Sequence, residues 1–282
     1  MTTAPSHPGS ADRDSRGAAS EIARRFVEAR LAGRALNGYP GEVPADLAAA
    51  YAIQEAAIAL WPEPVAGWKI GRVPPDWEPR LGAHRIAGPI FAGEIWAAVE
   101  DGEREFPVFE GGFAAVEAEF IFRLGQDAPA DRADWTIEDA AVLVGELLIG
   151  VEPAGSPLAT INDLGPAVVV SDFGNNAGLI VGARAADWRD RLMSMTCETF
   201  IEGRSVGRGG AASIPGGPLE SLRFLLELTA RRGRPLRAGD LVSTGAATGI
   251  HDILAGQSAR IVFDGVGEVR CRAIPATGRA RP

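Results

Sequence analysis

The chain has 282 residues, a formal net charge of −9 and a hydrophobic content of 46%, so it can bury a large apolar core, and its acidity argues against a nucleic-acid partner. No apolar run is long enough to span a bilayer, and the polar start lacks the hydrophobic segment of a signal peptide. The two cysteines, Cys197 and Cys271, lack the spacing of a disulfide framework or a zinc ribbon, which favours a soluble protein in the reducing cytoplasm with no membrane partner.

The first part of the chain is expected to be mostly helical. Residues 1–18, rich in Ser, Pro, Gly and charge, predict a disordered tail. Apolar residues then recur at helical spacing over 19–32 and again over 44–60. A short strand is predicted over 65–71, and the irregular Pro- and Gly-rich stretch to about residue 93 predicts a loop of the kind that often lines a site.

Strands predominate in the rest of the chain. Two helices are expected there, one over 219–229 and a shorter one that Thr136 caps, with Asp139 three residues later in place of the usual Glu or Gln. The predicted strands cover residues 94–99, 115–124, 143–151, 167–170, 179–181, 241–243, 258–263 and 267–274. Because strands outnumber helices and do not alternate with them strictly, the predicted fold class is α+β.

The domain organisation follows from the same pattern. No internal repeat and no clear linker is visible after the tail. We therefore expect a single catalytic domain over 19–278, with a helical part over about 19–65 and a β-rich core over about 66–278.

Glu117 and Glu119 lie two residues apart in an otherwise apolar run. In an extended strand both side chains project from the same face. Two carboxylates in one buried pocket repel each other and lose hydration unless a cation neutralises them or one stays protonated, and their oxygens suit Mg²⁺ or Mn²⁺. The alternative is an amphipathic edge strand with both glutamates on a solvated face. The spacing alone leaves both interpretations open.

Lys69 lies at the centre of Gly67-Trp-Lys-Ile-Gly71, among apolar residues and glycines that permit close backbone approach. A lysine there is costly unless it is paired or its ammonium reaches solvent. It is a candidate catalytic residue, with a surface lysine on an edge strand as the alternative. His84, in the following predicted loop, is a further acid or base candidate, and it has no second histidine nearby that would indicate a zinc site.

Three further segments carry candidate site residues. Glu152 lies where a predicted strand meets a Pro- and Gly-containing turn, and a glutamate there is either part of a site or solvated. The turn-rich segment 171–178, which includes Asn176, either presents donors to an anionic ligand or is a loop stabilised by Asx turns. The turn that begins Thr244-Gly245 can present N–H groups and a hydroxyl to a carboxylate, but it lacks the lysine and spacing of a phosphate loop.

Taken in order, these segments resemble the fumarylacetoacetate hydrolase superfamily and, within it, the 2-keto-4-pentenoate hydratases and 4-oxalocrotonate decarboxylases. The resemblance covers about residues 20–275. It rests on the ordered set Ala-Tyr-Ala-Ile-Gln54, Gly-Trp-Lys-Ile-Gly71, Glu117-Ala-Glu119, Glu152, Ser171-Asp-Phe-Gly-Asn-Asn-Ala-Gly178 and Thr-Gly-Ala-Ala-Thr-Gly249. It implies a mixed β-roll core with flanking helices in a homo-oligomeric enzyme.

The resemblance also implies an activity and the residues that carry it. By position they are Glu117, Glu119 and Glu152 for Mg²⁺ or Mn²⁺, Lys69 for proton transfer, and Thr244 and Gly245 for the substrate carboxylate. A small 2-oxo or 2-hydroxy-dienoic acid that chelates the ion would give a stabilised enolate, and a lysine of lowered pKa would move protons along the dienol. The implied enzyme is a Mg²⁺-dependent hydratase, a lyase of aromatic-compound degradation.

Two departures from this branch leave the exact reaction open. The branch often has an Asp before a Gly in the loop after the lysine, where this chain reads Ala87-Gly88, and a Ser-Arg pair after the third metal carboxylate, where it reads Ser156-Pro157. The alternatives are decarboxylation of a 4-oxalocrotonate-like substrate and C–C hydrolysis of an acylpyruvate, for which His84 is the candidate base. A noncatalytic subunit in complex with a homologous pathway enzyme is an alternative of another class.

Overall fold

The computed structural model describes residues 11–278, with side chains from residue 16 onward. The helices of this part of the chain are α1 (Ala11–Leu31), α2 (Leu47–Leu60), α3 (Glu78–Leu81), α4 (Ile137–Val142), α5 (Pro166–Ser171), α6 (Trp188–Arg191) and α7 (Gly217–Arg231), with short 3₁₀ segments η1 (Ala92–Glu94), η2 (Phe173–Asn175), η3 (Leu192–Ser194) and η4 (Ala211–Ser213). Within the described residues, no helix is both long and apolar enough to cross a membrane.

The strands are β1 (Val65–Arg72), β2 (Arg85–Phe91), β3 (Ile95–Ala97), β4 (Arg104–Val108), β5 (Phe113–Leu124), β6 (Val144–Ser156), β7 (Leu179–Arg184), β8 (Thr196–Ile201), β9 (Arg204–Gly210), β10 (Leu241–Ser243), β11 (Ile250–Asp252), β12 (Ser258–Phe263) and β13 (Gly267–Pro275). They form two sheets with both parallel and antiparallel pairs. The larger has the order β2-β1-β10-β5-β6-β7-β3, with β11 also paired to β5, and the smaller has the order β4-β13-β12-β8-β9.

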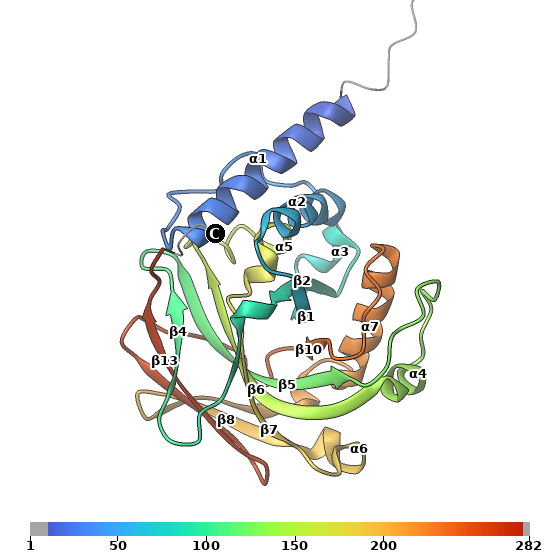
Figure 1. Ribbon diagram of the computed structural model, residues 1–282, viewed down its shortest axis with the longest axis vertical. Coiled ribbons are helices and arrows are strands. Elements are labelled where there is room, and N and C mark those ends of the chain that lie inside the picture. The colour runs from blue at the N-terminus through green and yellow to red at the C-terminus, as the bar shows by residue number, and fades with distance from the viewer. Residues whose placement is uncertain (1–10, 279–282) are drawn as a thin grey trace, which may run out of the picture.

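The two long strands β5 and β6 curve beneath β1 and β10, and α2, α3 and α5 lie above them, with α7 at one side (Figure 1). Both long strands are almost wholly buried because apolar side chains cover them on the two faces. The prediction of an α+β fold with a mixed β-roll core and flanking helices is confirmed.

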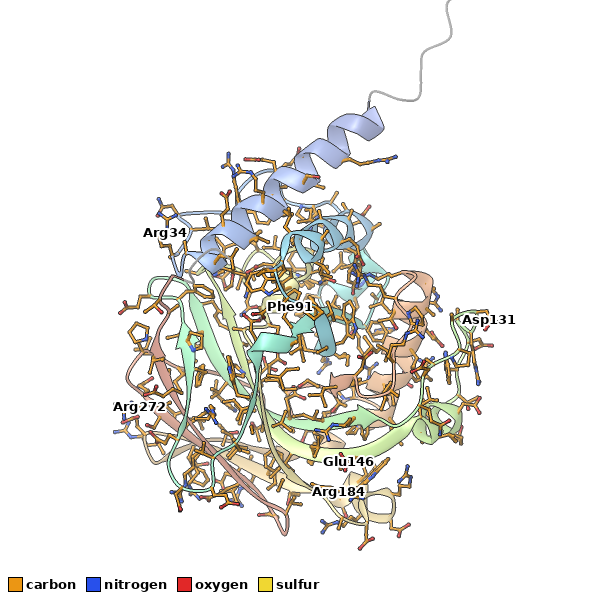
Figure 2. The ribbon with its side chains drawn as sticks, in the orientation of Figure 1. Arg34, Phe91, Asp131, Glu146, Arg184 and Arg272 are labelled. Atoms are coloured by element: carbon orange, nitrogen blue, oxygen red, sulfur yellow. The ribbon has the colours of Figure 1, made fainter. Side chains whose placement is uncertain are left out.

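An aromatic cluster fills the space between α2 and the larger sheet. Figure 2 shows Phe91 inside the molecule, whereas the labelled charged residues lie around its outside. Phe91 stacks on Trp61 with ring centroids 5.0 Å apart, and it meets Phe173 edge-on at 4.9 Å. All three side chains are buried. The cluster therefore ties α2, β2 and η2 to one another.

Two segments differ in kind from the sequence prediction. Much of the predicted loop before residue 93 is strand β2, which pairs antiparallel with β1 and is almost fully buried. It tolerates Pro89 because it is an edge strand, and only one of its sides needs backbone donors for a neighbouring strand. Residues 167–170, predicted as a strand from their valines, belong to helix α5, which starts at Pro166 after a left-handed Gly165.

Other differences concern boundaries. Of the predicted disordered tail, residues 1–10 lie outside the described residues, and residues 11–18 form the first turns of α1 instead. Strand β6 continues through Pro153 to Ser156, so Glu152 lies inside a strand and not where a strand meets a turn. Other elements that the sequence did not predict include α3, α6, β4, β8, β9 and β11. The Thr136 cap is confirmed, since its side chain accepts the N–H of Asp139.

The free edge of β2 is closed by side chains of α2. The hydroxyl of Tyr51 accepts the backbone N–H of Ala87 at 3.0 Å, and the amide of Gln54 donates to the carbonyl oxygens of Ala87 and Val170, each at 3.0 Å. Gln54 is completely buried, and Arg232 donates to its Oε1. These bonds satisfy backbone groups that no strand or helix satisfies, and they hold β2 against α5.

We expect Gln54→Met to lower the free energy of unfolding by about 2–4 kcal/mol, because it leaves two buried carbonyl oxygens without a donor. Urea-induced unfolding measures this change. The control is Gln126→Met, which removes a glutamine that donates to the carbonyl of Val142 from an exposed position, and for which we expect a change of less than about 0.5 kcal/mol. Equal effects of the two substitutions would contradict a role of Gln54 in holding β2.

Candidate active site

Three glutamates from adjacent strands come together in the interior. The antiparallel register of β5 and β6 places Glu117 directly opposite Glu152, so both side chains leave the same face of the sheet. Glu119 follows two residues along β5 and joins them on that face. One carboxylate oxygen of each lies within 4.8 Å of the others. None is more than 4% exposed, so the alternative of a solvated glutamate pair does not hold.

The carboxylates of this cluster have oxygens without a partner. Among the described residues, nothing donates a hydrogen bond to Oε1 of Glu117, Oε1 of Glu119 or Oε2 of Glu152. Buried anionic oxygens without partners are costly. Three of them on separate carboxylates, close together, form a donor set that suits a hard divalent cation. The residues present therefore fit the metal site that the sequence predicts.

Burial makes the cluster difficult to ionise without a cation. It raises the pKa of Glu117 to about 7, against the opposing effect of Lys69. It raises the pKa of Glu119 well above its usual range, and the charges of Glu152 and Glu117 raise it further. It also raises the pKa of Glu152, although Lys69 and Asn176 act in the other direction. Without a cation, the cluster therefore tends to retain protons.

Lys69 points into the same space from β1. Its Nζ lies 3.2 Å from Oε1 of Glu152 and donates to Oδ1 of Asn175 at 3.1 Å. The side chain is buried, so the alternative of a surface lysine is wrong. Burial by itself lowers the pKa of Lys69, but the three glutamates outweigh it and the net shift is upward. The expectation of a lowered pKa is thus wrong for this arrangement, in which Lys69 holds its proton.

The partner of Lys69, Asn175, was not singled out by the sequence. It lies in η2, where Phe173, Gly174 and Asn175 have φ values of 56°, 66° and 56°. Left-handed conformations cost non-glycine residues about 1–3 kcal/mol unless packing imposes them. Here Phe173 packs in the aromatic cluster. The backbone of Gly88 lies so close to Phe173 and Gly174 that a Cβ on residue 88 would not fit. The Asn-Asn pair after glycine is compatible with this conformation, since Asn tolerates it, but it does not identify Lys69 as the partner.

The predicted substrate-binding residues lie at the site, but their donors are engaged within the chain. The hydroxyl of Thr244 donates to the carbonyl of Phe120 at 2.7 Å, and the N–H of Gly245 donates to Oε2 of Glu119 at 2.8 Å. Asn176 donates to Oε1 of Glu152 at 3.0 Å. In this arrangement Gly245 and Asn176 orient carboxylates of the cluster. Their contact with substrate stays a prediction.

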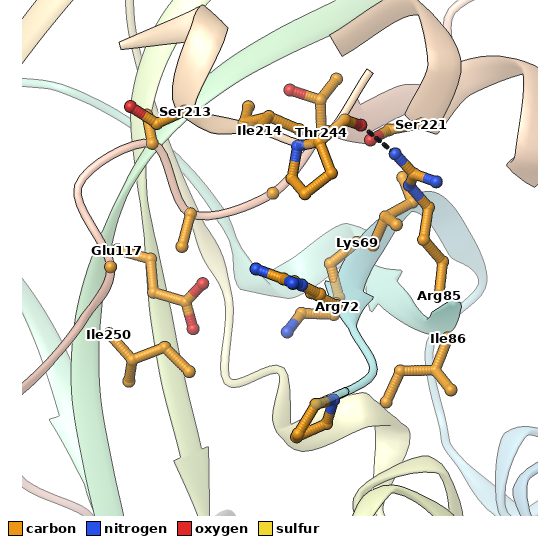
Figure 3. A pocket seen from close by; sticks show the side chains of 18 of the residues that line it. Lys69, Arg72, Arg85, Ile86, Glu117, Ser213, Ile214, Ser221, Thr244 and Ile250 are labelled. Carbon is orange, nitrogen blue, oxygen red and sulfur yellow. Dashed lines mark hydrogen bonds between the residues drawn. The ribbon is translucent and has the colours of Figure 1, made fainter. Parts of the chain in front are cut away.

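A cavity of about 950 Å³ opens onto the cluster, and Lys69, Glu117 and Asn175 are among the residues that line it (Figure 3). His84 lines it too, but its side chain is 78% exposed. Its Nδ1 lies 2.7 Å from a carboxylate oxygen of Glu78. The structure thus brings Lys69 into the carboxylate cluster, whereas it leaves His84 at an exposed part of the cavity wall.

A buried ion pair lies at the end of β6, close to the site. The guanidinium of Arg30, in α1, donates to both carboxylate oxygens of Asp172 and to the carbonyl of Gly155. The hydroxyl of Ser156 donates to the same carboxylate at 2.6 Å. A buried arginine from α1 therefore reaches the end of β6, at Gly155 and beside Ser156. Sequence analysis missed Arg30 because nothing local to α1 marks its distant partner.

The cavity wall also contains Arg72 and Arg85, at the ends of β1 and β2 that face the cavity. Sequence analysis singled out neither residue. Their proximity depends on the pairing of β1 with β2, and β2 lies in the stretch predicted to be a loop. No local pattern therefore signalled that these two arginines are register partners at the cavity.

No protein-family model matches the chain. The 2-keto-4-pentenoate hydratase of Burkholderia vietnamiensis strain G4 is 30% identical to it over 257 residues, covering 89% of this chain and 95% of that protein. Among solved structures, the 4-oxalocrotonate decarboxylase from Pseudomonas putida G7 complexed with magnesium and adipate superposes with a TM-score of 0.76 at 20% identity, covering 92% of this chain and 98% of that one. The fumarylpyruvate hydrolase from Pseudomonas aeruginosa in complex with Mn²⁺ and pyruvate gives a TM-score of 0.56 at 18% identity, covering 76% and 91%.

The raised pKa values predict how stability depends on pH in metal-free protein. Above the ordinary glutamate pKa of 4.5, the unfolded chain loses protons that the folded cluster retains. The free energy of unfolding should therefore fall as the pH rises from about 5 to 7, by up to about 1.4 kcal/mol per pH unit for each retained proton.

Urea-induced unfolding in the presence of a chelator, at several pH values, measures this slope. We expect Glu117→Gln to flatten it, because glutamine does not titrate. Glu146→Gln, which removes a carboxylate paired with Arg123 outside the cluster, should leave the slope as it is. Stability that rises over this pH range in the metal-free protein would contradict the protonated cluster.

Proposed function

The chain belongs to the 2-keto-4-pentenoate hydratase branch of the fumarylacetoacetate hydrolase superfamily and is an enzyme, and from this we propose its reaction. We propose that it is a metal-dependent hydratase of a small 2-hydroxy-dienoate in the degradation of aromatic compounds. The observation that carries the proposal is the buried cluster of three carboxylates with unpartnered oxygens, next to a buried lysine in the wall of a cavity. Both features suit chemistry on a 2-oxo acid, since a cation can stabilise an enolate and a lysine can transfer a proton.

In this proposal Glu117, Glu119 and Glu152 hold Mg²⁺ or Mn²⁺. Their oxygen-only donor set and their three negative charges support a hard cation over a soft one. The solved structures of similar fold that contain magnesium or manganese support the same choice. When bound, the cation would supply a Lewis acid that stabilises negative charge developing on a 2-oxo acid.

Lys69 is then the residue that handles protons. The neighbouring carboxylates hold it in the ammonium form, and Asn175 and Glu152 fix the position of Nζ at the cavity wall. An ammonium in that position is suited to donate a proton to the terminal carbon of the dienol, and the proton of the 2-hydroxyl then passes to the neutral amine, which gives the 2-oxo-3-enoate and restores the ammonium. Water then adds across the C3–C4 double bond. Its hydroxide bonds to C4, and its proton bonds to C3, the carbon next to the oxo group.

The remaining assignments follow the same resemblance. Gly245 and Asn176 orient Glu119 and Glu152, and Thr244 lies beside the space for the substrate carboxylate. We also propose that the enzyme forms a homo-oligomer and works in the cytoplasm. The substrate that we propose is a small 2-oxo acid, and no nucleic acid or membrane takes part.

A second candidate is hydrolytic C–C cleavage of an acylpyruvate. The specific observation in its favour is the His84–Glu78 pair, an imidazole oriented by a carboxylate in the cavity wall, which could activate water. Decarboxylation of a 4-oxalocrotonate-like acid would use the same metal ligands and enolate chemistry. Product analysis separates the three reactions, because they yield a hydroxylated 2-oxo acid, two cleavage products, or CO₂. The complete carboxylate cluster and buried Lys69 argue against a noncatalytic subunit.

Metal binding predicts a thermal shift that does not require turnover. At a concentration about 100-fold above its dissociation constant, Mn²⁺ or Mg²⁺ should stabilise the protein by about 2.7 kcal/mol and raise the melting temperature by about 5 °C or more. Glu119→Gln and Glu152→Gln should abolish the shift, whereas Glu198→Gln, which removes a surface partner of Arg208, should retain it. Differential scanning fluorimetry after chelator treatment measures it. An unchanged shift in both cluster variants would place the cation elsewhere.

The activity itself is tested by ultraviolet absorbance, which follows the loss of 2-hydroxypenta-2,4-dienoate with Mg²⁺. We expect loss with the wild type, and rates at least about 100-fold lower with Glu119→Gln and Lys69→Met, since one removes a metal ligand and the other the proton donor. Glu146→Gln is the matched control. Absence of turnover by wild-type protein that still shows the thermal shift would contradict a hydratase of this monocarboxylate and direct the assay to other 2-hydroxy-dienoates and to the two alternative substrates.

A further inference from the structure

Two arginines are register partners on the neighbouring strands β1 and β2, and both line the cavity. Arg72, the last residue of β1, is the register partner of Arg85, the first residue of β2. Directly opposite side chains lie on the same face of an antiparallel pair, and like charges in these positions destabilise the pairing. Both residues line the cavity that contains Lys69. The register thus brings two positive charges to one edge of the cavity, with Arg72 exposed and Arg85 partly buried.

Arg85 has hydrogen-bond and ion-pair partners of its own, and none of these partners also binds Arg72. The guanidinium of Arg85 donates to the carbonyl of Pro215 and lies 3.8 Å from a carboxylate oxygen of Glu220. Glu220 is shared, because Arg223 binds it more closely at 2.6 Å. Burial lowers the pKa of Arg85, Glu220 opposes this, and the charges of Arg223 and Arg72 lower it further. Arg85 is therefore a cation with little anionic compensation.

Arg72 differs from the other basic residues of the cavity. Lys69 is paired with Glu152, Arg85 with Glu220, and Arg208 with Glu198 at 2.5 Å. For Arg72, no hydrogen bond or ion pair occurs within residues 11–278. Figure 3 shows its guanidinium extending from the end of β1 over the cavity, on the side where Glu117 lies, while Arg85 turns toward α7. Arg72 is exposed, and all of its donors are therefore available to a ligand that enters the cavity from solvent.

A third polar group of the same wall is also unpartnered. Ser221, on α7, is 1% exposed and lines the cavity, and its hydroxyl has no hydrogen-bond partner among the described residues. Figure 3 shows it near the guanidinium of Arg85. A buried hydroxyl without a partner is costly unless a ligand binds it. It is therefore a second donor in the part of the wall where the cations lie.

We propose that this part of the cavity binds a second carboxylate of the substrate, with Arg72 as its principal ligand, so that the enzyme takes a 2-oxo or 2-hydroxy-dienoic dicarboxylate. The inference rests on the proposed function, which places the first carboxylate and the 2-oxygen at the glutamate cluster. Arg72 follows Lys69 by three residues along β1, about 10 Å of extended chain, a separation that an extended dicarboxylate can bridge with the reach of the side chains. An anion beside Arg72 would also remove its repulsion with Arg85.

Binding of two unreactive acids tests the proposal without turnover. Isothermal titration calorimetry of the Mg²⁺-loaded protein compares 2-oxoadipate with 2-oxohexanoate, which has the same chain length but ends in a methyl group. We expect the wild type to bind 2-oxoadipate at least about tenfold more tightly. Arg72→Gln should bring the ratio of the two dissociation constants close to one, and Arg72→Lys should restore part of it, because lysine keeps the charge but not the bidentate geometry.

The control is Arg208→Gln, which removes a cavity arginine that already has a partner and should leave the ratio as in the wild type. Arg72→Gln should melt no lower than the wild type, since it removes a like-charge pair. Equal affinities for the two acids in the wild type, or an unchanged ratio in Arg72→Gln, would overturn the inference while leaving the proposed function in place. Failure of the wild type to bind either acid would overturn both.

Discussion

The structure around the site depends on one electrostatic constraint, the burial of three carboxylates beside a single ammonium. Glu117, Glu119 and Glu152 carry three negative charges when ionised, and Lys69 contributes one positive charge in contact with them. Solvent compensates little of the excess charge, because all of these side chains are buried. The imbalance is relieved either by protons, which the raised pKa values of the glutamates indicate, or by a divalent cation. Protons and metal therefore compete for the same oxygens.

This constraint explains why so much of the fold is committed to holding side chains in place. The register of β5 and β6 sets Glu117 opposite Glu152, and a slip of one residue would turn Glu117 to the other face. Asn175 is presented to Lys69 by a left-handed turn that would be strained in isolation. That turn is held by Phe173 in the aromatic cluster. Helix α2, remote from the chemistry, thus contributes to the site through packing.

The parts of the site that sequence reasoning found are those with a local pattern. Two glutamates at period two within an apolar run can be recognised because strand geometry alone puts them together. Glu152 was found through family resemblance and placed in the wrong local context, since Pro153 suggested a turn although β6 continues beyond it. Asn175 and Arg30 were missed because their partners are distant in sequence. Their contribution depends on tertiary packing, which no local pattern encodes.

The same distinction explains the errors in the fold. Strand β2 contains Gly88 and Pro89, which usually interrupt a strand, but an edge position and the side chains of α2 accommodate them. The valines of α5 favour a strand by propensity, yet a left-handed glycine followed by proline starts a helix there. Because β2 was not predicted, the pairing of Arg72 with Arg85 was not foreseen either.

The cavity has opposite charges in two places, excess carboxylate at the cluster and excess guanidinium at the ends of β1 and β2. A ligand that spans both places and has its charge neutralised at each must carry an anionic group at each end. A metal cation would hold one anionic group at the carboxylate cluster, and the arginines would bind the other directly.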